Sequence, residues 1–134
     1  MRQIIYSQLI NIKSLQVLIK KNLVFAIFYS IFILFISLIR IESQSDITSL
    51  DKLLHTAIYF FFCLIWHNPF NELFKERAII YLFIFSILFG VFIELLQGNA
   101  VHYRSAELLD ICFNVLGSII SCSLLLLINR IKKS

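Results

Sequence analysis

Long apolar stretches alternate with short polar ones along this chain. The apolar stretches cover residues 22–39, 53–66, 78–96 and 108–128. A helix that crosses a lipid bilayer needs about 20 predominantly apolar residues, and three of the four stretches are close to that length. The stretch 53–66 is shorter, so Lys52 or His67 would have to lie at the membrane interface to complete it. The pattern therefore predicts an all-α protein, an integral membrane bundle of four transmembrane helices.

The amino-acid composition agrees with this prediction. Of the 134 residues, 60% are hydrophobic and 15% are charged, and the mean hydropathy is +0.89. A soluble domain has about 45–50% apolar and about 25% charged residues, so too little polar surface remains to cover a soluble globule. The length suffices for one domain. The net charge of +4 does not indicate nucleic-acid binding, because no soluble face is left on which a basic patch could form.

The positions of the Lys and Arg residues predict the orientation of the helices. With four spans, nine of the 12 basic residues fall in the amino-terminal segment, the loop between the second and third spans, and the carboxyl-terminal segment. Cytoplasmic segments are enriched in Lys and Arg, so both termini are predicted to be cytoplasmic. The basic segment 1–21 fits an interfacial amphipathic helix as well as a loosely ordered tail. Residues 22–134 form the membrane domain, in which residues 68–71, with Pro69, are predicted to form a turn.

This topology brings polar residues of three helices to the outer face of the membrane. Asp110, Asn114 and Gly117 are spaced i, i+4 and i+7, so they share one face of the fourth helix. At a rise of about 1.5 Å per residue, His55 lies about 6 Å deeper than Asp51 on the second helix. Ionisable groups inside a membrane helix are costly and usually functional, so the convergence predicts a polar pocket at the outer face.

The residue types in this pocket suggest what each could do. Asp51 and His55 are at i, i+4, so the carboxylate can orient the imidazole. Glu94, Asp110 and His55 are the candidates for general acid–base catalysis, and the same three are the candidate ligands if the pocket holds a divalent metal. The predicted ligand-binding residues, the first two of which would hold an anionic group, are Arg104, Lys52, Gln97, Asn114 and Asp51. No HExxH, GxSxG or Walker-type spacing occurs in the sequence, so the sequence identifies no particular cofactor or metal.

Packing offers a simpler explanation for the same residues. Arg104 can pair with Asp110 or Glu94 and close the helix bundle, and Asn114 can form a hydrogen bond between helices. Small residues inside the apolar stretches fit close helix packing or buried apolar positions; these are Gly90, Gly117, Cys63, Cys112 and Cys122. The polar motif would then be a structural brace and the protein a non-catalytic accessory protein.

Three blocks of this chain resemble the VanZ-like family. In order they read Asp51-Lys52-x-x-His55, Gly90-x-x-x-Glu94-x-x-Gln97 and Arg104-Ser-Ala-Glu-x-x-Asp110-x-x-x-Asn114-x-x-Gly117. Together they cover about residues 50–120, and their order and spacing agree with the family pattern. The resemblance implies a small bacterial membrane protein of about four helices, and the family's namesake is associated with resistance to the glycopeptide teicoplanin. The family name therefore gives a phenotype rather than a reaction.

Taken together, these observations predict a multi-pass protein of the bacterial cytoplasmic (inner) membrane, in contact with membrane lipids. Its outward-facing pocket would bind or modify an anionic envelope component, such as a lipid-linked or peptidoglycan precursor. The accessory protein described above is the alternative. A transporter with Glu94 as a proton relay is less favoured, because the acids cluster at one face and no inverted repeat is visible. The sequence indicates no oligomeric state.

Overall fold

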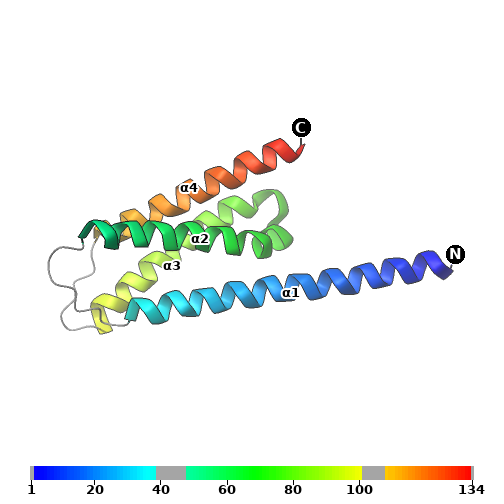
Figure 1. Cartoon of the computed structure of the whole chain (residues 1–134), viewed down its shortest axis with the longest axis horizontal. Coiled ribbons are helices and arrows are strands. Elements are labelled where there is room, and N and C mark those ends of the chain that lie inside the picture. Colours follow the sequence, from blue (N-terminus) through cyan, green and yellow to red (C-terminus); the bar gives the residue numbers. More distant parts are fainter. Residues whose placement is uncertain (1, 39–47, 101–107, 134) are drawn as a thin grey trace.

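The computed structural model describes residues 2–38, 48–100 and 108–133, and these residues are entirely helical (Figure 1). The helices are α1 (Arg2–Leu38), α2 (Thr48–Phe74), α3 (Ala78–Ala100) and α4 (Leu108–Lys133), with one 3-10 turn, η1 (Lys75–Arg77), between α2 and α3. The predicted all-α class is confirmed. Three stretches of helix are long and apolar enough to cross a membrane, Lys20–Leu38, Leu50–Gln97 and Leu108–Lys132. The second of them, with 48 residues, runs from α2 through η1 into α3.

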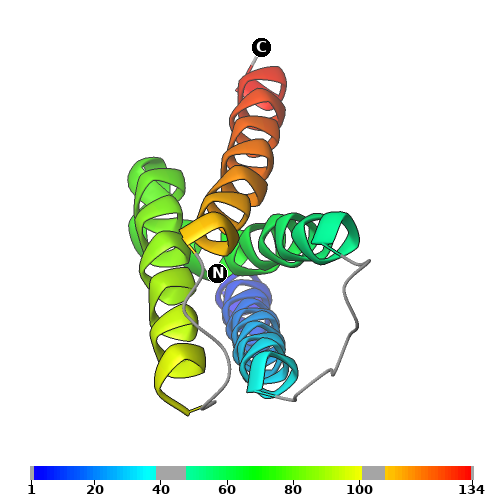
Figure 2. The ribbon, with the colours of Figure 1, turned by 90° about the vertical axis from the view of Figure 1, so that its left-hand side faces the viewer.

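Each helix runs antiparallel to the helix before it (Figure 1). The first turns of α2 and α4 and the last turns of α1 and α3 therefore lie together on the left in Figure 1; we call this the acidic end, after Asp51, Glu94 and Asp110. The opposite end holds η1 and the last turns of α4; we call it the basic end, after Lys75 and Arg130. Of the four helices, α2 contacts the other three, and its contact with α4 is the most extensive. Figure 2 shows α1 and α4 on opposite sides of α2.

An aromatic cluster fills the space between α2 and α3. Phe62 is fully buried and stacks on Phe85 and Phe89, with ring centroids 5.7 and 4.9 Å away. Trp66 lies beside Phe62, and its indole Nε1 donates a hydrogen bond of 3.0 Å to Ser30 Oγ on α1. Buried aromatic rings contribute large apolar areas, and a buried Trp N–H needs an acceptor. The cluster therefore holds α1, α2 and α3 together.

Apolar side chains also cover the outside of the molecule. Phe28 on α1, Leu88 on α3 and Leu127 on α4 are 68%, 63% and 56% exposed. Soluble proteins rarely expose contiguous apolar surface on this scale, whereas helices in lipid present apolar side chains outward. Glu94 and Asp110, in contrast, are buried. The distribution of polar and apolar groups is that of a protein surrounded by lipid.

The turn between α2 and α3 comes later than the sequence predicts. The predicted turn at residues 68–71 is wrong, because α2 continues through Pro69 to its end. A proline inside a helix removes one backbone hydrogen bond and crowds the preceding turn. Packing offsets this cost: Phe70 is buried and its ring centroid lies 5.3 Å from that of Phe85 on α3. The chain reverses at η1 instead, where Lys75 has a φ of 48°, in the left-handed region.

Two helix starts also differ from the predicted boundaries. α1 begins at Arg2 and has no break near residue 21, so the basic segment is continuous with the first apolar stretch. The first polar loop is predicted to extend to Lys52, whereas α2 begins at Thr48. Asp51 and Lys52 are therefore in the first turns of a helix, which fixes the directions of their side chains relative to His55.

The backbones of α2 and α4 come into direct contact close to the acidic end. Gly117 lies against Thr56, and a Cβ atom at Gly117 would overlap the Thr56 carbonyl oxygen. The Thr56 hydroxyl lies 3.1 Å from the Lys52 carbonyl oxygen on its own helix and 3.3 Å from that of Phe113 on α4, and it donates to both. Small residues permit such approaches between membrane helices, and the predicted packing role of Gly117 is confirmed. The contact sets the distance between the two helices beside the polar residues.

Candidate functional site

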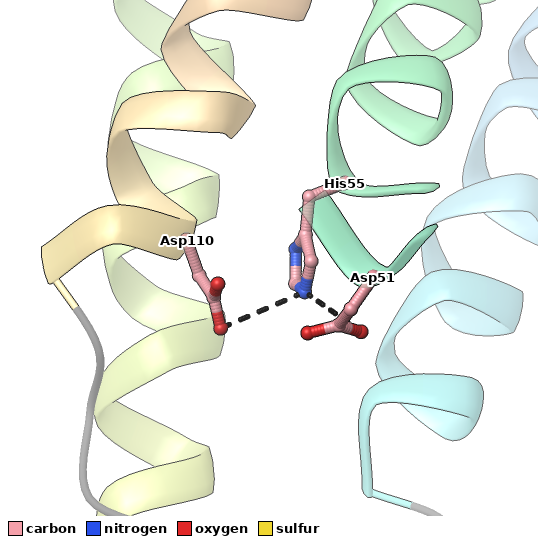
Figure 3. A group of neighbouring side chains, drawn as sticks. All are labelled: Asp51, His55 and Asp110. Carbon is pink, nitrogen blue, oxygen red and sulfur yellow. Dashed lines mark ion pairs between the residues drawn. The ribbon is translucent and has the colours of Figure 1, made fainter. Parts of the chain in front are cut away.

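His55 on α2 lies between two carboxylates. Its Nε2 atom is 3.9 Å from Asp51 Oδ1, one turn earlier on the same helix, and 3.7 Å from Asp110 Oδ2 on α4 (Figure 3). One ligand atom from each of the three residues can be chosen so that all lie within 4.8 Å of one another. We call these three residues the Asp51–His55–Asp110 cluster. It joins residues that are 59 positions apart in the chain, and it is the centre of the candidate site.

Helix starts position both carboxylates. Asp51 is in the first turn of α2, and Asp110 is in the first turn of α4. The first turn of a helix has backbone N–H groups without helical partners and the positive end of the macrodipole, which favours a carboxylate there. Because α2 and α4 run parallel and start at the same end of the molecule (Figure 1), both favourable positions coincide in space. The local rule for helix starts therefore places two acids next to one imidazole.

Asn114 fixes the other side of the imidazole ring. His55 Nδ1 and Asn114 Oδ1 are 3.1 Å apart, and an amide oxygen can only accept, so in this orientation Nδ1 carries the proton. Asn114 is 3% exposed, and its backbone carbonyl accepts a hydrogen bond of 3.0 Å from the Ser118 hydroxyl. In the neutral ring, the lone pair then lies on Nε2, which is the atom that faces Asp51 and Asp110.

Burial differs strongly across the cluster. The side chain of Asp110 is 2% exposed, that of His55 is 13% exposed and that of Asp51 is 48% exposed. The site is therefore closed on the side of α4 and accessible on the side of Asp51. A ligand arriving at the acidic end of the molecule would meet Asp51 first.

Glu94 and Gln97, on α3, are both buried at 2% exposure. The Gln97 amide nitrogen donates a hydrogen bond of 2.7 Å to the Ser37 carbonyl oxygen on α1, and in Figure 2 the last turns of α3 approach the end of α1. Glu94 is close enough to the Tyr59 hydroxyl on α2 for an electrostatic interaction. Among the described residues, the group that could hold a metal ion is Asp51, His55 and Asp110. The sequence predicts Glu94 in place of Asp51, which lies one helical turn from His55.

Of the two predicted anion-binding residues, Lys52 belongs to the described part of the chain and Arg104 does not. Lys52 is half-buried, and its Nζ atom lies 5.8 Å from the centroid of the Phe113 ring on α4, within reach of a cation–π interaction. Arg104 lies outside the described residues, as does the loop around it. The site as described therefore contains two carboxylates, one imidazole, one buried amide and one neighbouring ammonium group.

A second polar region lies at the basic end and was not predicted as a site. It is an open cavity of about 600 Å³ between the α2–α3 turn and the last turns of α4. Its lining includes Lys75, Glu76, Arg130 and Lys132. The sequence pattern uses the three basic residues of this lining only to predict membrane orientation. The cavity itself depends on how the end of α4 packs near the α2–α3 turn, which the pattern does not show.

The cysteines divide into two groups. Cys63 and Cys122 are buried free thiols on α2 and α4, as predicted for buried apolar residues. Cys112 is exposed on α4, so the prediction is wrong for this residue. Its side chain lies on the exposed face of α4, which lipid would cover.

No family model, curated protein or solved structure matches this chain. The geometry of the site therefore has to be interpreted from its own residues. What these provide is an imidazole with a defined hydrogen-bond partner, two acids and an accessible side, at the end of a helical molecule with an apolar surface.

Proposed function

We propose that this chain is a four-span, VanZ-like protein of the bacterial inner membrane whose acidic end binds or modifies an anionic component of the cell envelope. Its 48-residue apolar stretch, Leu50–Gln97, supports four spans. As a straight helix it would be about 72 Å long, more than twice the bilayer core of about 30 Å. Since it reverses at η1, it crosses twice.

The distribution of basic residues supports the orientation. The start of α1, the turn η1 and the end of α4 hold nine of the 12 Lys and Arg residues. These three segments belong on the cytoplasmic side. The acidic end then faces the outside of the inner membrane, where lipid-linked and peptidoglycan precursors are exposed.

The observation that carries the functional part is the position of His55. It is in contact range of two acids and an amide from two helices, and the half-exposed Asp51 opens this group to the aqueous side. Histidine is the side chain that most often acts in general acid–base catalysis, and a neighbouring carboxylate can orient its ring. Lys52, and Arg104 in the adjoining loop, supply the positive charge that holds the anionic group.

The test is ligand binding by the purified protein in detergent. The ligands are an isoprenoid lipid carrying a pyrophosphate, phosphatidylglycerol and a zwitterionic lipid. We expect the Lys52→Gln and Arg104→Gln variants each to bind the pyrophosphate lipid about tenfold more weakly, since the loss of one charged contact is worth about 1.4 kcal/mol. Lys20→Gln, an exposed lysine on α1, is the matched control and should bind like the wild type. Equal binding by all variants would contradict the proposal.

A structural brace is the second candidate function, and the contact of Gly117 with Thr56 favours it. The site lies beside the closest approach of α2 and α4, and the bond between His55 and Asn114 connects the same two helices. For a brace, isosteric changes in the cluster should reduce thermal stability and leave ligand binding unaltered. For a binding site, they should do the reverse.

A further inference from the structure

His55 Nε2 and one oxygen of each neighbouring carboxylate face one another between α2 and α4. Because Nδ1 donates to Asn114, Nε2 of the neutral ring presents a lone pair toward carboxylate oxygens 3.7 and 3.9 Å away. These distances exceed the usual 2.7–3.2 Å of an N–H···O hydrogen bond. One nitrogen and two oxygen atoms, all possible metal ligands, thus lie within 4.8 Å of one another.

The same distances fit atoms that bind one cation. A nitrogen and an oxygen that are each about 2.0–2.2 Å from a zinc ion, in tetrahedral geometry, lie about 3.4 Å apart. The two nitrogen–oxygen separations in the cluster, 3.7 and 3.9 Å, are a few tenths of an ångström larger, and the two carboxylate oxygens lie within 4.8 Å of one another. Small rotations of the two carboxylates would bring all three atoms to bonding distance, and Asp51, being half-exposed, has room to rotate.

We propose that Asp51, His55 and Asp110 bind a divalent transition-metal ion through His55 Nε2 and one oxygen of each carboxylate. Imidazole as a ligand favours zinc or a similar ion over magnesium or calcium, which prefer oxygen ligands. Three protein ligands leave a coordination position open for water or a ligand, as in catalytic zinc sites. Asn114 acts as a positioning residue, because its hydrogen bond to Nδ1 holds Nε2 in the metal-binding tautomer.

Asn114 provides a second observation that points to a ligand. Its amide nitrogen is buried, adjoins the imidazole and has no hydrogen-bond partner within the described part of the chain. Buried polar groups are nearly always paired. A donor left over beside the cluster fits an oxygen atom of a bound ligand, in addition to the metal.

The metal site rests on the proposed function and adds a mechanism to it. The negative charge of two carboxylates disfavours an anionic ligand. A divalent cation bound between them would offset this charge and would offer an open coordination position to a phosphate oxygen. The accessible side at Asp51 is where this oxygen would approach. A metal therefore explains how a site with two acids can attract the anionic group that the proposed function assigns to Lys52 and Arg104.

The first experiment measures the metal directly and requires no activity. The full chain is purified in detergent, treated with a chelator, and titrated with Zn²⁺ by calorimetry and with Co²⁺ by visible absorption. We expect one ion per chain. Asp51→Asn should weaken binding by at least about tenfold and His55→Gln by at least about 100-fold, because ligand loss exceeds the 10–100-fold effect of losing a supporting partner. His67→Gln and Glu72→Gln, remote from the cluster, are the matched controls.

Asp51→Asn keeps the test decisive if His55→Gln does not fold, because Asp51 is half-exposed. No ion bound by folded wild-type protein would overturn the inference, and so would equal affinities in Asp51→Asn and the controls. Pyrophosphate-lipid binding unaffected by chelator would also overturn the role of the metal while leaving the proposed function standing. Metal binding without any lipid binding would support the metal site and contradict the proposed function.

Discussion

The two ends of this molecule both collect charged residues, but they do so in different ways. At the acidic end, Asp110 is buried and His55 nearly so, and they contact one another across α2 and α4. At the basic end, Lys75, Arg130 and Lys132 are exposed and surround an open cavity. Exposed charges act mainly through the overall field and are screened by salt, whereas buried ones depend on specific partners. We therefore expect the acidic end to be sensitive to single substitutions and the basic end to tolerate them.

The largest loss of stability is expected from a substitution that pushes α2 and α4 apart at the acidic end. Gly117→Ala places a Cβ against the Thr56 carbonyl, which cannot move without its helix. We expect a loss of about 3 kcal/mol in the free energy of unfolding, the upper part of the range for overpacking, measured by thermal unfolding in detergent. Gly90→Ala is the control, because its Cβ would meet only the Tyr59 side chain, at 3.3 Å, and should cost less than about 1 kcal/mol. Equal losses of stability in Gly117→Ala and Gly90→Ala would mean that the backbone contact with Thr56 does not cause the effect.

His55→Gln should have the next largest effect. It removes the imidazole that bonds to Asn114 Oδ1, and it leaves this buried oxygen without its partner. The cost of such an unpaired group is about 1–3 kcal/mol, so a loss of about 2 kcal/mol is expected in urea or thermal unfolding. His67→Gln is the histidine control and should change stability by less than about 0.5 kcal/mol. If both variants were equally stable, the hydrogen bond would not hold the helices.

Asp110→Asn tests whether the acidic end is a ligand-binding site or a structural brace. The substitution keeps the shape and removes a buried charge. We expect the metal-free protein to become more stable by about 1 kcal/mol, since functional groups are often held at the expense of stability. The thermal midpoint in the presence of chelator is the measurement. A midpoint lowered by the equivalent of about 3 kcal/mol would support the brace, because breaking a buried pair is strongly destabilising.

The smallest change in stability is expected at the basic end. Each of the substitutions Lys75→Gln, Arg130→Gln and Lys132→Gln removes one exposed charge beside the cavity and should by itself alter the free energy of unfolding by no more than about 0.5 kcal/mol. The triple variant combines the three. It should nevertheless increase the fraction of molecules inserted in the opposite orientation, because basic residues set topology. Accessibility of a tag at the end of α4, measured in intact cells, gives this fraction. An unchanged orientation would show that the remaining basic residues suffice.

The sequence predicted best where the apolar pattern was uninterrupted. The predicted spans 78–96 and 108–128 begin at the first residues of α3 and α4, because polar segments precede both. The turn was misplaced since Pro69 is a strong local signal, and the aromatic packing that overrides it comes from α3. The local sequence pattern thus located the helices, but it contains no information on the contacts between them.

The candidate site shows the same limit. Pairing of Asp51 with His55 follows from their spacing on one helix and was predicted. The approach of Asp110 and Asn114 depends on the rotation of α4 about its axis relative to α2, and no spacing within one helix contains that information. Gln97 was predicted as a ligand-binding residue, and its amide nitrogen bonds to the α1 backbone. The direction of a buried amide is decided by whichever neighbouring helix offers an acceptor.

The contact between Gly117 and Thr56 also has a mechanical consequence. At this contact the two backbones touch directly, so it leaves less freedom for relative movement of α2 and α4 than contacts between flexible side chains do. Thr56 is next to His55, whereas the end of α2 is 18 residues away, about 27 Å along the helix. A change in the crossing angle centred on this contact would therefore displace His55 less than the far end of α2. The same contact thus constrains the geometry around His55 more tightly than the width of the cavity at the basic end.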